Sequence, residues 1–240
     1  AKVARKLRCF EQRHLRLPNL IVPISKPDEQ VFKSWGIEVK SISIPVGIEW
    51  PKYNLKNLHS EQQLQIGFIG ALDWLPNIEG LEWFLKNVWK PFNLAKYAHL
   101  NIAGRNMPEK IRNKNIPSTT FYGDVPNAID FMRNNDVLIV PLLSGSGMRV
   151  KILEGMALGK VIITSSLGAE GIPITNGQNI IIADTPNLYA QNIIKMSTNF
   201  TEASKMALAA KHLIQSKFSN HKLGEQLIAC YHQNLMVPLT

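Results

Sequence analysis

The stretch DVLIVPLLSGSGMRVKILEGMALGKVIITSS, residues 136–166, contains the strongest indication of how this chain folds. It begins with the continuous apolar run DVLIVPLL, which predicts a strand buried on both faces. A loop of serine and glycine follows, and apolar residues then recur at helical spacing until Gly159 ends the pattern. The second apolar run, KVIITSS, predicts another buried strand. Strand, helix and strand in this order indicate two parallel strands joined by a helix.

The same alternation extends to both sides of this stretch. Further strands are expected at LQIGFIG, HLNIAG, TTFYG and NIIIA. Helices are expected at NIEGLEWFLKNVW, NAIDFMRNN, PNLYAQNIIKMS, EASKMALAAKHLIQSKF and LGEQLIACYHQNLM. Asn77 is placed to cap the first of these helices, and Pro91 is placed to stop it. We therefore expect an α/β fold with a Rossmann-like parallel sheet and helices on both faces.

The first 60 residues follow a different pattern. NLIVPIS (residues 19–25) predicts a buried strand, KPDEQVFKSWG a short helix, and KSISIPVGIEWPKYN a short strand followed by a turn-rich segment. The polar stretch LKNLHSEQQ that comes next is the best candidate for a domain boundary. Because the chain opens within a helical pattern at Ala1, we expect it to be a piece of a longer protein.

Composition and charge narrow the choice of partners. The chain has 240 residues, of which 45% are hydrophobic, so a sizeable core can form. No apolar run approaches the ~18–20 residues of a membrane span, and the first residues do not have the pattern expected of a signal peptide. Cys9 and Cys230 lie at opposite ends and indicate neither a disulfide framework nor a metal site, which favours a reducing compartment. The net charge of +9 suits nucleic acid, an anionic membrane or a phosphorylated small molecule.

Much of this positive charge clusters in the first helical pattern. Its basic residues are Lys2, Arg5, Lys6, Arg8, Arg13 and Arg16. Val3, Leu7 and Phe10 recur between them at helical spacing. The segment is therefore either an amphipathic helix that lies on a membrane surface or an ordinary helix with a solvated basic face.

The loop at Ser144–Gly147 is the first candidate for a ligand site, because ligands of parallel α/β sheets bind beyond the carboxyl ends of the strands. Unpaired N–H groups and the dipole of the following helix favour a phosphate there, and glycine allows close approach of the backbone. Arg149 and Lys151 add full positive charges. Glu154 follows on the same helix face, where a carboxylate suits a pair of sugar hydroxyls. The alternative is a plain glycine turn beside a solvated Lys151–Glu154 pair.

A dinucleotide-binding loop is a second alternative for the same glycines. That pattern requires Gly or Ala where Val150 stands, and an acidic residue at the end of the next strand. The next strand ends instead in Ser165 and Ser166. NAD binding is therefore not expected.

Three other loops follow predicted strands. The first contains Gly70, Asp73 and Trp74, the second is Gly104–Asn106, and the third is SSLGAEG at residues 165–171. Each alone is a connection. Together at one edge of a parallel sheet, the four loops would frame a cleft.

These residues resemble a known family. The segments GFIGALDWLPNIEGLEWFLKNVW, NIAGRN and FYGDVPNAIDFMRNNDVLIVPLLSGSGMRVKILEGMALGKVIITSSLGAEGI follow one another as in the donor half of a GT-B glycosyltransferase. The similarity is greatest to family four, the retaining enzymes that use nucleotide sugars, and it extends from about Ile66 to Ile172. It implies three parts: the end of an acceptor domain with the crossing (residues 1–48), a donor-binding domain (49–218) and a C-terminal helix that packs back toward the first half (219–240). About 150 residues of the family's first half would be missing.

The resemblance also implies roles for individual residues. Glu154 matches the family's second motif glutamate, which binds the ribose, whereas the first motif glutamate is replaced by Ser146. Val125 matches the position where the base meets the backbone. The loop at Gly70–Asn77 lacks the family's Arg and Lys, so we expect Arg149 and Lys151 to supply that charge. The expected donor-binding positions are Gly70, Asp73, Val125, Gly145, Ser146, Gly147, Met148 and Val150.

The implied activity is transfer of a sugar from a nucleotide diphosphate to an acceptor hydroxyl with retained configuration, in polysaccharide or glycoconjugate synthesis. No metal and no cofactor are expected beyond the nucleotide-sugar donor substrate. The other partner would be a glycan or lipid-linked acceptor. The expected location is the cytoplasm, with peripheral contact to the inner face of the membrane. Two alternatives stay open: a nucleotide-sugar binding module without transfer activity, and a basic nucleic-acid-binding domain. The sequence contains no known nucleic-acid recognition motif that would support the second.

Overall fold

The structure is a computed structural model that describes residues 2–49 and 63–235. The chain divides into two compact units, one made of residues 1–49 and 217–240 and the other of residues 50–216. The assignment of three domains at 1–48, 49–218 and 219–240 stays a prediction.

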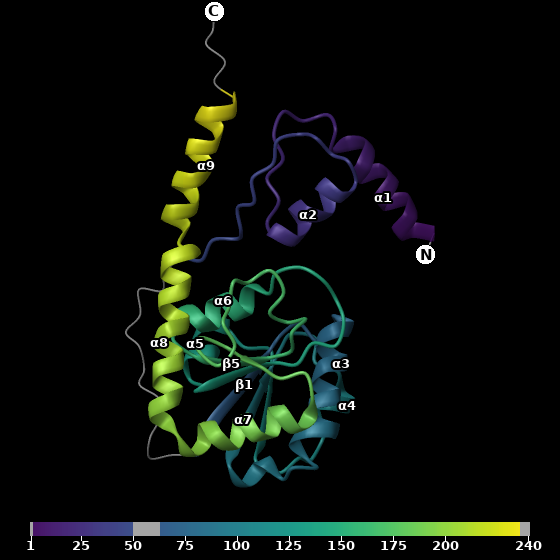
Figure 1. Cartoon of the computed structure of the whole chain (residues 1–240). Coiled ribbons are helices and arrows are strands. Elements are labelled where there is room, and N and C mark those ends of the chain that lie inside the picture. Colours follow the sequence, from purple (N-terminus) through teal and green to yellow (C-terminus); the bar gives the residue numbers. More distant parts are fainter. Residues whose placement is uncertain (1, 50–62, 236–240) are drawn as a thin grey trace, which may run out of the picture. The chain divides into compact units, whose positions relative to one another are not determined.

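The larger unit is built on a six-stranded parallel sheet with the order β3-β2-β1-β4-β5-β6 (Figure 1). Its strands are β1 (Leu64–Ile69), β2 (Ala98–Ala103), β3 (Thr119–Gly123), β4 (Val137–Val140), β5 (Val161–Thr164) and β6 (Ile181–Ile182). All five pairings are parallel. The expected Rossmann-like sheet is therefore confirmed.

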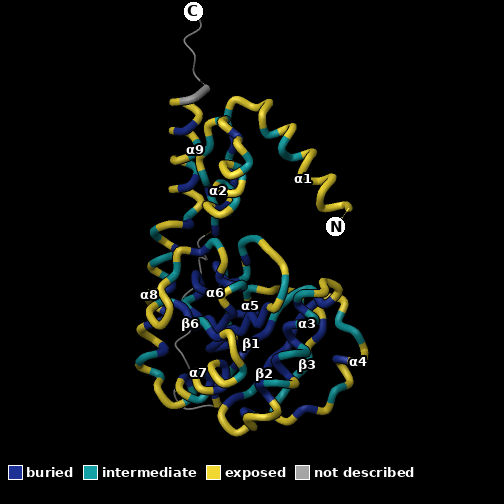
Figure 2. The backbone as a smooth tube through the Cα atoms, turned by 45° about the vertical axis from the view of Figure 1, so that its right-hand side comes forward, coloured by how far each residue is buried: buried dark blue, intermediate teal, exposed yellow. Residues whose placement is uncertain are grey.

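Helices surround this sheet. They are α3 (Leu75–Phe84), α4 (Glu109–Arg112), α5 (Ala128–Arg133), α6 (Val150–Ala157), α7 (Pro186–Thr198) and α8 (Phe200–Lys217), with a π-helical turn at Leu85–Trp89 and a 3-10 turn at Leu94–Lys96. Figure 1 shows α5 and α6 on one side of the strands and α3 and α4 on the other. The strands are mostly buried, as Figure 2 shows in dark blue, because they are covered on both faces.

Two of the predicted helix boundaries shift for local reasons. α3 begins at Leu75, so Asn77 is not its cap but lies within the first turn. α6 begins at Val150 rather than Met148, because Gly147 has a φ of +89° and Arg149 is still extended. Gly159, with a φ of +66°, does end the helix as expected.

The smaller unit contains α1 (Lys2–His14), α2 (Lys26–Ser34) and α9 (Asn220–Leu235). Ser25 caps α2 by accepting a hydrogen bond from the Asp28 N–H. The strand predicted at residues 19–25 is wrong, since only an isolated bridge between Ile21 and Ser41 forms there. Pro23 has no N–H to donate, and a strand needs neighbours with which to pair.

Candidate functional site

The carboxyl ends of five strands lie at one edge of the sheet, because β1 to β5 are parallel neighbours. Backbone hydrogen bonds join the loops that follow: Gly70 N–H donates to Ala103 O, Leu72 N–H to Arg105 O, and Gly104 N–H to Gly123 O. Asn106 Nδ2 also donates to Asp73 Oδ2 at 2.8 Å. On the other side of β1, Ser165 Oγ donates to Leu142 O in the segment after β4, and Ser144 Oγ donates to Glu79 Oε2 in α3. The four loops predicted to share an edge are therefore linked by hydrogen bonds to one another or to α3.

The glycine loop after β4 has the backbone that its sequence predicts. Gly145 and Gly147 have φ angles of +99° and +89°, which favour glycine. Ser146 between them is exposed, as is Val150, and Met148 is half-buried. Arg149 takes the N-cap position of α6 but its side chain makes no capping bond. The first N–H groups of α6 are thus left without a side-chain cap next to an open glycine turn.

Arg149 is buried, with only 8% of the residue exposed. Its Nη1 donates to the carbonyl oxygen of Ser146, while Nε and Nη2 are buried without a hydrogen-bond partner in the described parts of the chain. Burial lowers the pKa of Arg149, and the charge of Glu170 partly opposes that shift. A buried guanidinium with two unsatisfied donors is costly unless an anion binds to it.

Lys151 is held between two elements far apart in sequence. Its Nζ donates to Ile69 O at 3.0 Å, at the end of β1, and to Asn77 Oδ1 at 2.9 Å, in the first turn of α3. Burial and the nearby charge of Arg149 lower the pKa of Lys151 from 10.5 to about 8. The alternative of a solvated Lys151–Glu154 pair is therefore wrong.

Asn77 has a role that the sequence analysis missed. It is buried, and its Nδ2 donates to Ala71 O at 2.8 Å while its Oδ1 accepts from Lys151. A Cβ on Gly70 would lie 2.7 Å from Asn77 Nδ2 and 3.0 Å from Lys151 Nζ. The absence of a side chain at Gly70 thus allows this close packing. The residues around Asn77 in the sequence give no sign of its hydrogen bond to Lys151, which lies 74 positions away.

Glu154 lies one turn further along α6 and is half-buried. Burial raises the pKa of its carboxyl group above the ordinary value. Within residues 2–49 and 63–235, no hydrogen bond or ion pair engages this carboxylate. It is therefore open to a ligand with hydroxyl donors.

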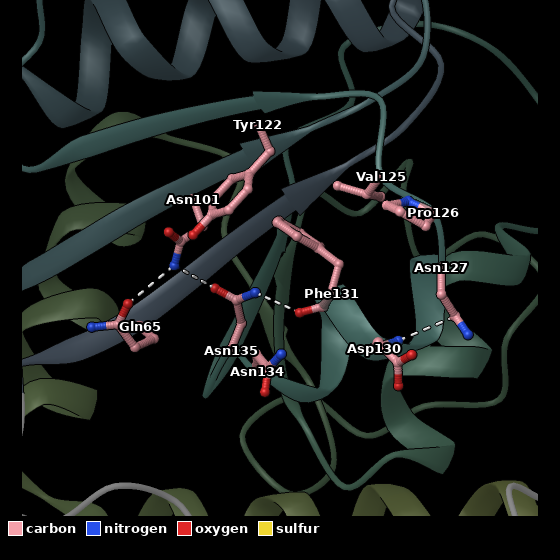
Figure 3. Close-up of a pocket in the computed structure, with 10 residues that line it drawn as sticks. All are labelled: Gln65, Asn101, Tyr122, Val125, Pro126, Asn127, Asp130, Phe131, Asn134 and Asn135. Atoms are coloured by element: carbon pink, nitrogen blue, oxygen red, sulfur yellow. Dashed lines mark hydrogen bonds between the residues drawn. The ribbon is translucent and has the colours of Figure 1, made fainter.

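A cavity of about 350 Å³ lies beside α5, on the face of β1, β2 and β3 (Figure 3). Its lining residues are Gln65, Asn101, Tyr122, Val125, Pro126, Asn127, Asp130, Phe131, Asn134 and Asn135. At its floor Asn101 Nδ2 donates to Gln65 Oε1 and to Asn135 Oδ1. Of the predicted site residues, Val125 lines this cavity, and Arg149, Lys151 and Glu154 are not among its lining residues.

Comparison with known proteins assigns the chain to a family. The family Glycosyl transferases group 1 matches residues 63–199, more than half of the 240 residues. The chain belongs to this family. An uncharacterized 44.6 kDa protein in the cps region of Klebsiella pneumoniae is 30% identical over 214 residues, which cover 83% of this chain and 53% of that protein. The chain thus spans about half the length of this relative.

Solved glycosyltransferase structures share its fold. Anabaena HepE in complex with UDP and glucose matches with a TM-score of 0.74 and 14% identity, over 94% of this chain and 66% of HepE. Sucrose-phosphate synthase of Thermosynechococcus elongatus matches with a TM-score of 0.75 and 16% identity, over 95% of this chain and 61% of the synthase. The pneumococcal O-GlcNAc transferase GtfA, in complex with UDP and GlcNAc, matches with a TM-score of 0.72 and 14% identity, over 95% of this chain and 48% of GtfA. The Rossmann-like fold of a GT-B glycosyltransferase is thereby confirmed.

Two further observations concern residues 2–49 and 63–235. None of the helices in these residues is both long enough and apolar enough to cross a membrane. No group of three or more His, Cys, Asp or Glu side chains is arranged there to hold a metal ion.

Proposed function

We propose that the complete protein is a retaining glycosyltransferase that moves a sugar from a nucleotide diphosphate to an acceptor hydroxyl, in polysaccharide or glycoconjugate synthesis. The chain described here is the donor-binding part. The observation that carries this proposal is the buried guanidinium of Arg149 at the uncapped start of α6, whose Nε and Nη2 have no hydrogen-bond partner within residues 2–49 and 63–235. Family membership supports the same activity.

The diphosphate of the donor binds at the glycine loop. The backbone of Gly145, Ser146 and Gly147, with Met148 and Val150 beyond, approaches its oxygens, and Arg149 donates to them. Lys151 adds positive charge next to the loop that contains Gly70 and Asp73, because its Nζ bonds to Ile69 O and Asn77 Oδ1 on either side of that loop. When the bond to the sugar breaks, the leaving diphosphate gains negative charge, and these fixed dipoles and cations stabilise it.

The nucleoside end of the donor lies toward Glu154 and Val125. The carboxylate of Glu154, which has no hydrogen-bond partner among the described residues, accepts hydrogen bonds from the two ribose hydroxyls, and the backbone at Val125 meets the base. HepE and GtfA were both solved with UDP. UDP is therefore the first nucleotide to test.

Ser146 favours a second candidate, a nucleotide-sugar binding module without transfer activity. The family's first motif glutamate, which contacts the transferred sugar, is absent at this exposed position. Turnover of a nucleotide sugar by the full chain, measured as release of nucleoside diphosphate in the presence of acceptor, separates the two candidates.

The test of donor binding is thermal unfolding of the full chain against UDP, GDP and ADP. A ligand that binds only the folded state raises the unfolding temperature. We expect one diphosphate to give a clear rise that Glu154→Ala reduces, while Glu109→Ala, an exposed glutamate of α4, leaves it unchanged. Absence of a rise with all three nucleotides, confirmed by calorimetry, would contradict the proposal.

We also propose that the enzyme works in the cytoplasm, in peripheral contact with the inner face of the membrane. α1 supports this contact, because none of its described residues is buried and Val3, Leu7 and Phe10 are all more than half exposed. Basic and apolar residues on one exposed helix suit an anionic lipid surface. Flotation with anionic vesicles, absent with neutral ones, is the expected result.

A further inference from the structure

The loop after β1 contains no basic residue, but a side chain at its end contacts the guanidinium of Arg149. Trp74 stands at its end, next to the first turn of α3, with 41% of the residue exposed. The guanidinium carbon of Arg149 lies 5.5 Å from the centre of the Trp74 ring. The aromatic face therefore contacts a side chain at the glycine loop whose Nε and Nη2 find no hydrogen-bond partner in the described part of the chain.

The glycine loop is shaped around this contact. A Cβ on Gly145 would lie 3.1 Å from Arg149 Nη2 and 3.5 Å from two ring atoms of Trp74. Gly145 is thus packed between the ring and the guanidinium, in addition to needing its φ of +99°. An added Cβ would therefore crowd Arg149 Nη2, whereas its distance to the Trp74 ring would be that of an ordinary contact.

An aromatic ring holds a guanidinium in a different way from a carboxylate. A carboxylate accepts hydrogen bonds and neutralises the charge, so that little remains for a ligand. A ring attracts the cation through its negative face and accepts no conventional hydrogen bond from the N–H groups. This accounts for a guanidinium that is buried and held by a ring while Nε and Nη2 donate to no other described residue.

We infer that Trp74 is a positioning residue of the donor site, which holds Arg149 so that its free donors face the diphosphate. The inference rests on the proposed function. It assigns to the loop after β1 an indirect part in binding phosphate: the loop contributes no cation of its own but orients the cation of α6.

The test compares UDP and uridine binding to the full chain in four variants: Trp74→Leu, Trp74→Phe, Arg149→Met and the Trp74→Leu, Arg149→Met pair. Trp74→Leu keeps an apolar side chain but loses the ring face, so its dissociation constant for UDP should rise about tenfold. Trp74→Phe keeps a ring and should stay within about threefold. Uridine, which has no phosphate, should bind equally to all four variants and the wild type.

The double variant distinguishes positioning from general damage. If Trp74 acts only through Arg149, adding Trp74→Leu to Arg149→Met should weaken UDP binding less than twofold further. Additive losses, or unchanged UDP binding in Trp74→Leu when Arg149→Met binds weakly, would overturn the inference and leave the donor site intact. Unchanged UDP binding in Arg149→Met would overturn the diphosphate site itself, and the role of Trp74 with it. Unfolding temperatures close to that of the wild type show that each variant is folded.

Discussion

Lys151 on α6 donates a 2.9 Å hydrogen bond to Asn77 in the first turn of α3, and the same ammonium group bonds to Ile69 O at the end of β1. One buried cation thus joins the starts of two helices to the edge of the sheet. Its three donors and single charge make it both a structural and an electrostatic part of the donor site.

The charge of Lys151 predicts a pH dependence of nucleotide binding. With its pKa lowered to about 8, the ammonium group is charged at pH 7 and mostly neutral by pH 9. Affinity for UDP should therefore fall as the pH rises from 7 to 9. Titration calorimetry at several pH values measures this fall. The Lys151→Met variant should bind UDP weakly, and its affinity should not change with pH over this range. If UDP affinity fell equally with pH in the variant and the wild type, a group other than Lys151 would cause the pH dependence.

The same group predicts how stability changes with pH. The unfolded chain keeps the ordinary lysine pKa of 10.5, so between about pH 8 and 10.5 it binds more protons than the folded chain. The free energy of unfolding of the wild type, relative to Lys151→Met, should thus rise across this window. Denaturant unfolding of both proteins at pH 7 and pH 9.5 measures the difference; a relative fall would contradict it.

Substitution of Gly80 in α3 should reduce stability strongly. A Cβ there would lie 2.0 Å from the carbonyl oxygen of Pro141, just after β4, and that backbone cannot yield easily. Gly80→Ala should therefore cost about 1–3 kcal/mol of unfolding free energy, despite the higher helix propensity of alanine. Gly224→Ala in α9 is the matched control, since nothing lies within 4 Å of its added Cβ. That change should be neutral or stabilising by up to about 1 kcal/mol.

Substitution of Asn135 tests how much the buried amide network beside α5 contributes to the free energy of unfolding. Its Nδ2 donates to Phe131 O at 2.7 Å, and its Oδ1 accepts from Asn101. Asn135→Ala leaves these groups with fewer partners and should cost about 1–3 kcal/mol. The exposed neighbour Asn134 serves as control, and Asn134→Ala should stay within about 0.5 kcal/mol. Equal effects in the two variants would show that the network contributes little.

The alternative of a nucleic-acid-binding domain makes a prediction of its own. Binding through the net charge of +9 would fall steeply with salt and would not depend on sequence. We expect random oligonucleotides to bind weakly and not to compete with UDP. Competition in fluorescence anisotropy between a labelled oligonucleotide and UDP would instead place nucleic acid at the donor site.

Much of the fold follows from the sequence, and so does part of the site. The apolar runs at residues 137–140 and 161–164 predict buried parallel strands because their composition leaves no polar face. Gly145 and Gly147 predict an open turn before a helix, since glycine adopts left-handed backbone without strain. These features depend on residues close together in the chain, which a local pattern reports.

The contacts between residues far apart in the chain could be seen only in the folded structure. Lys151 bonds to Asn77, Arg149 meets the ring of Trp74, and the strand expected at residues 19–25 does not form. The order of apolar and polar residues was enough to predict which faces are buried, which helices follow which strands, and which loops carry charge. It did not determine which atoms meet across the sheet edge, because the direction of a buried side chain depends on packing against elements tens of residues away.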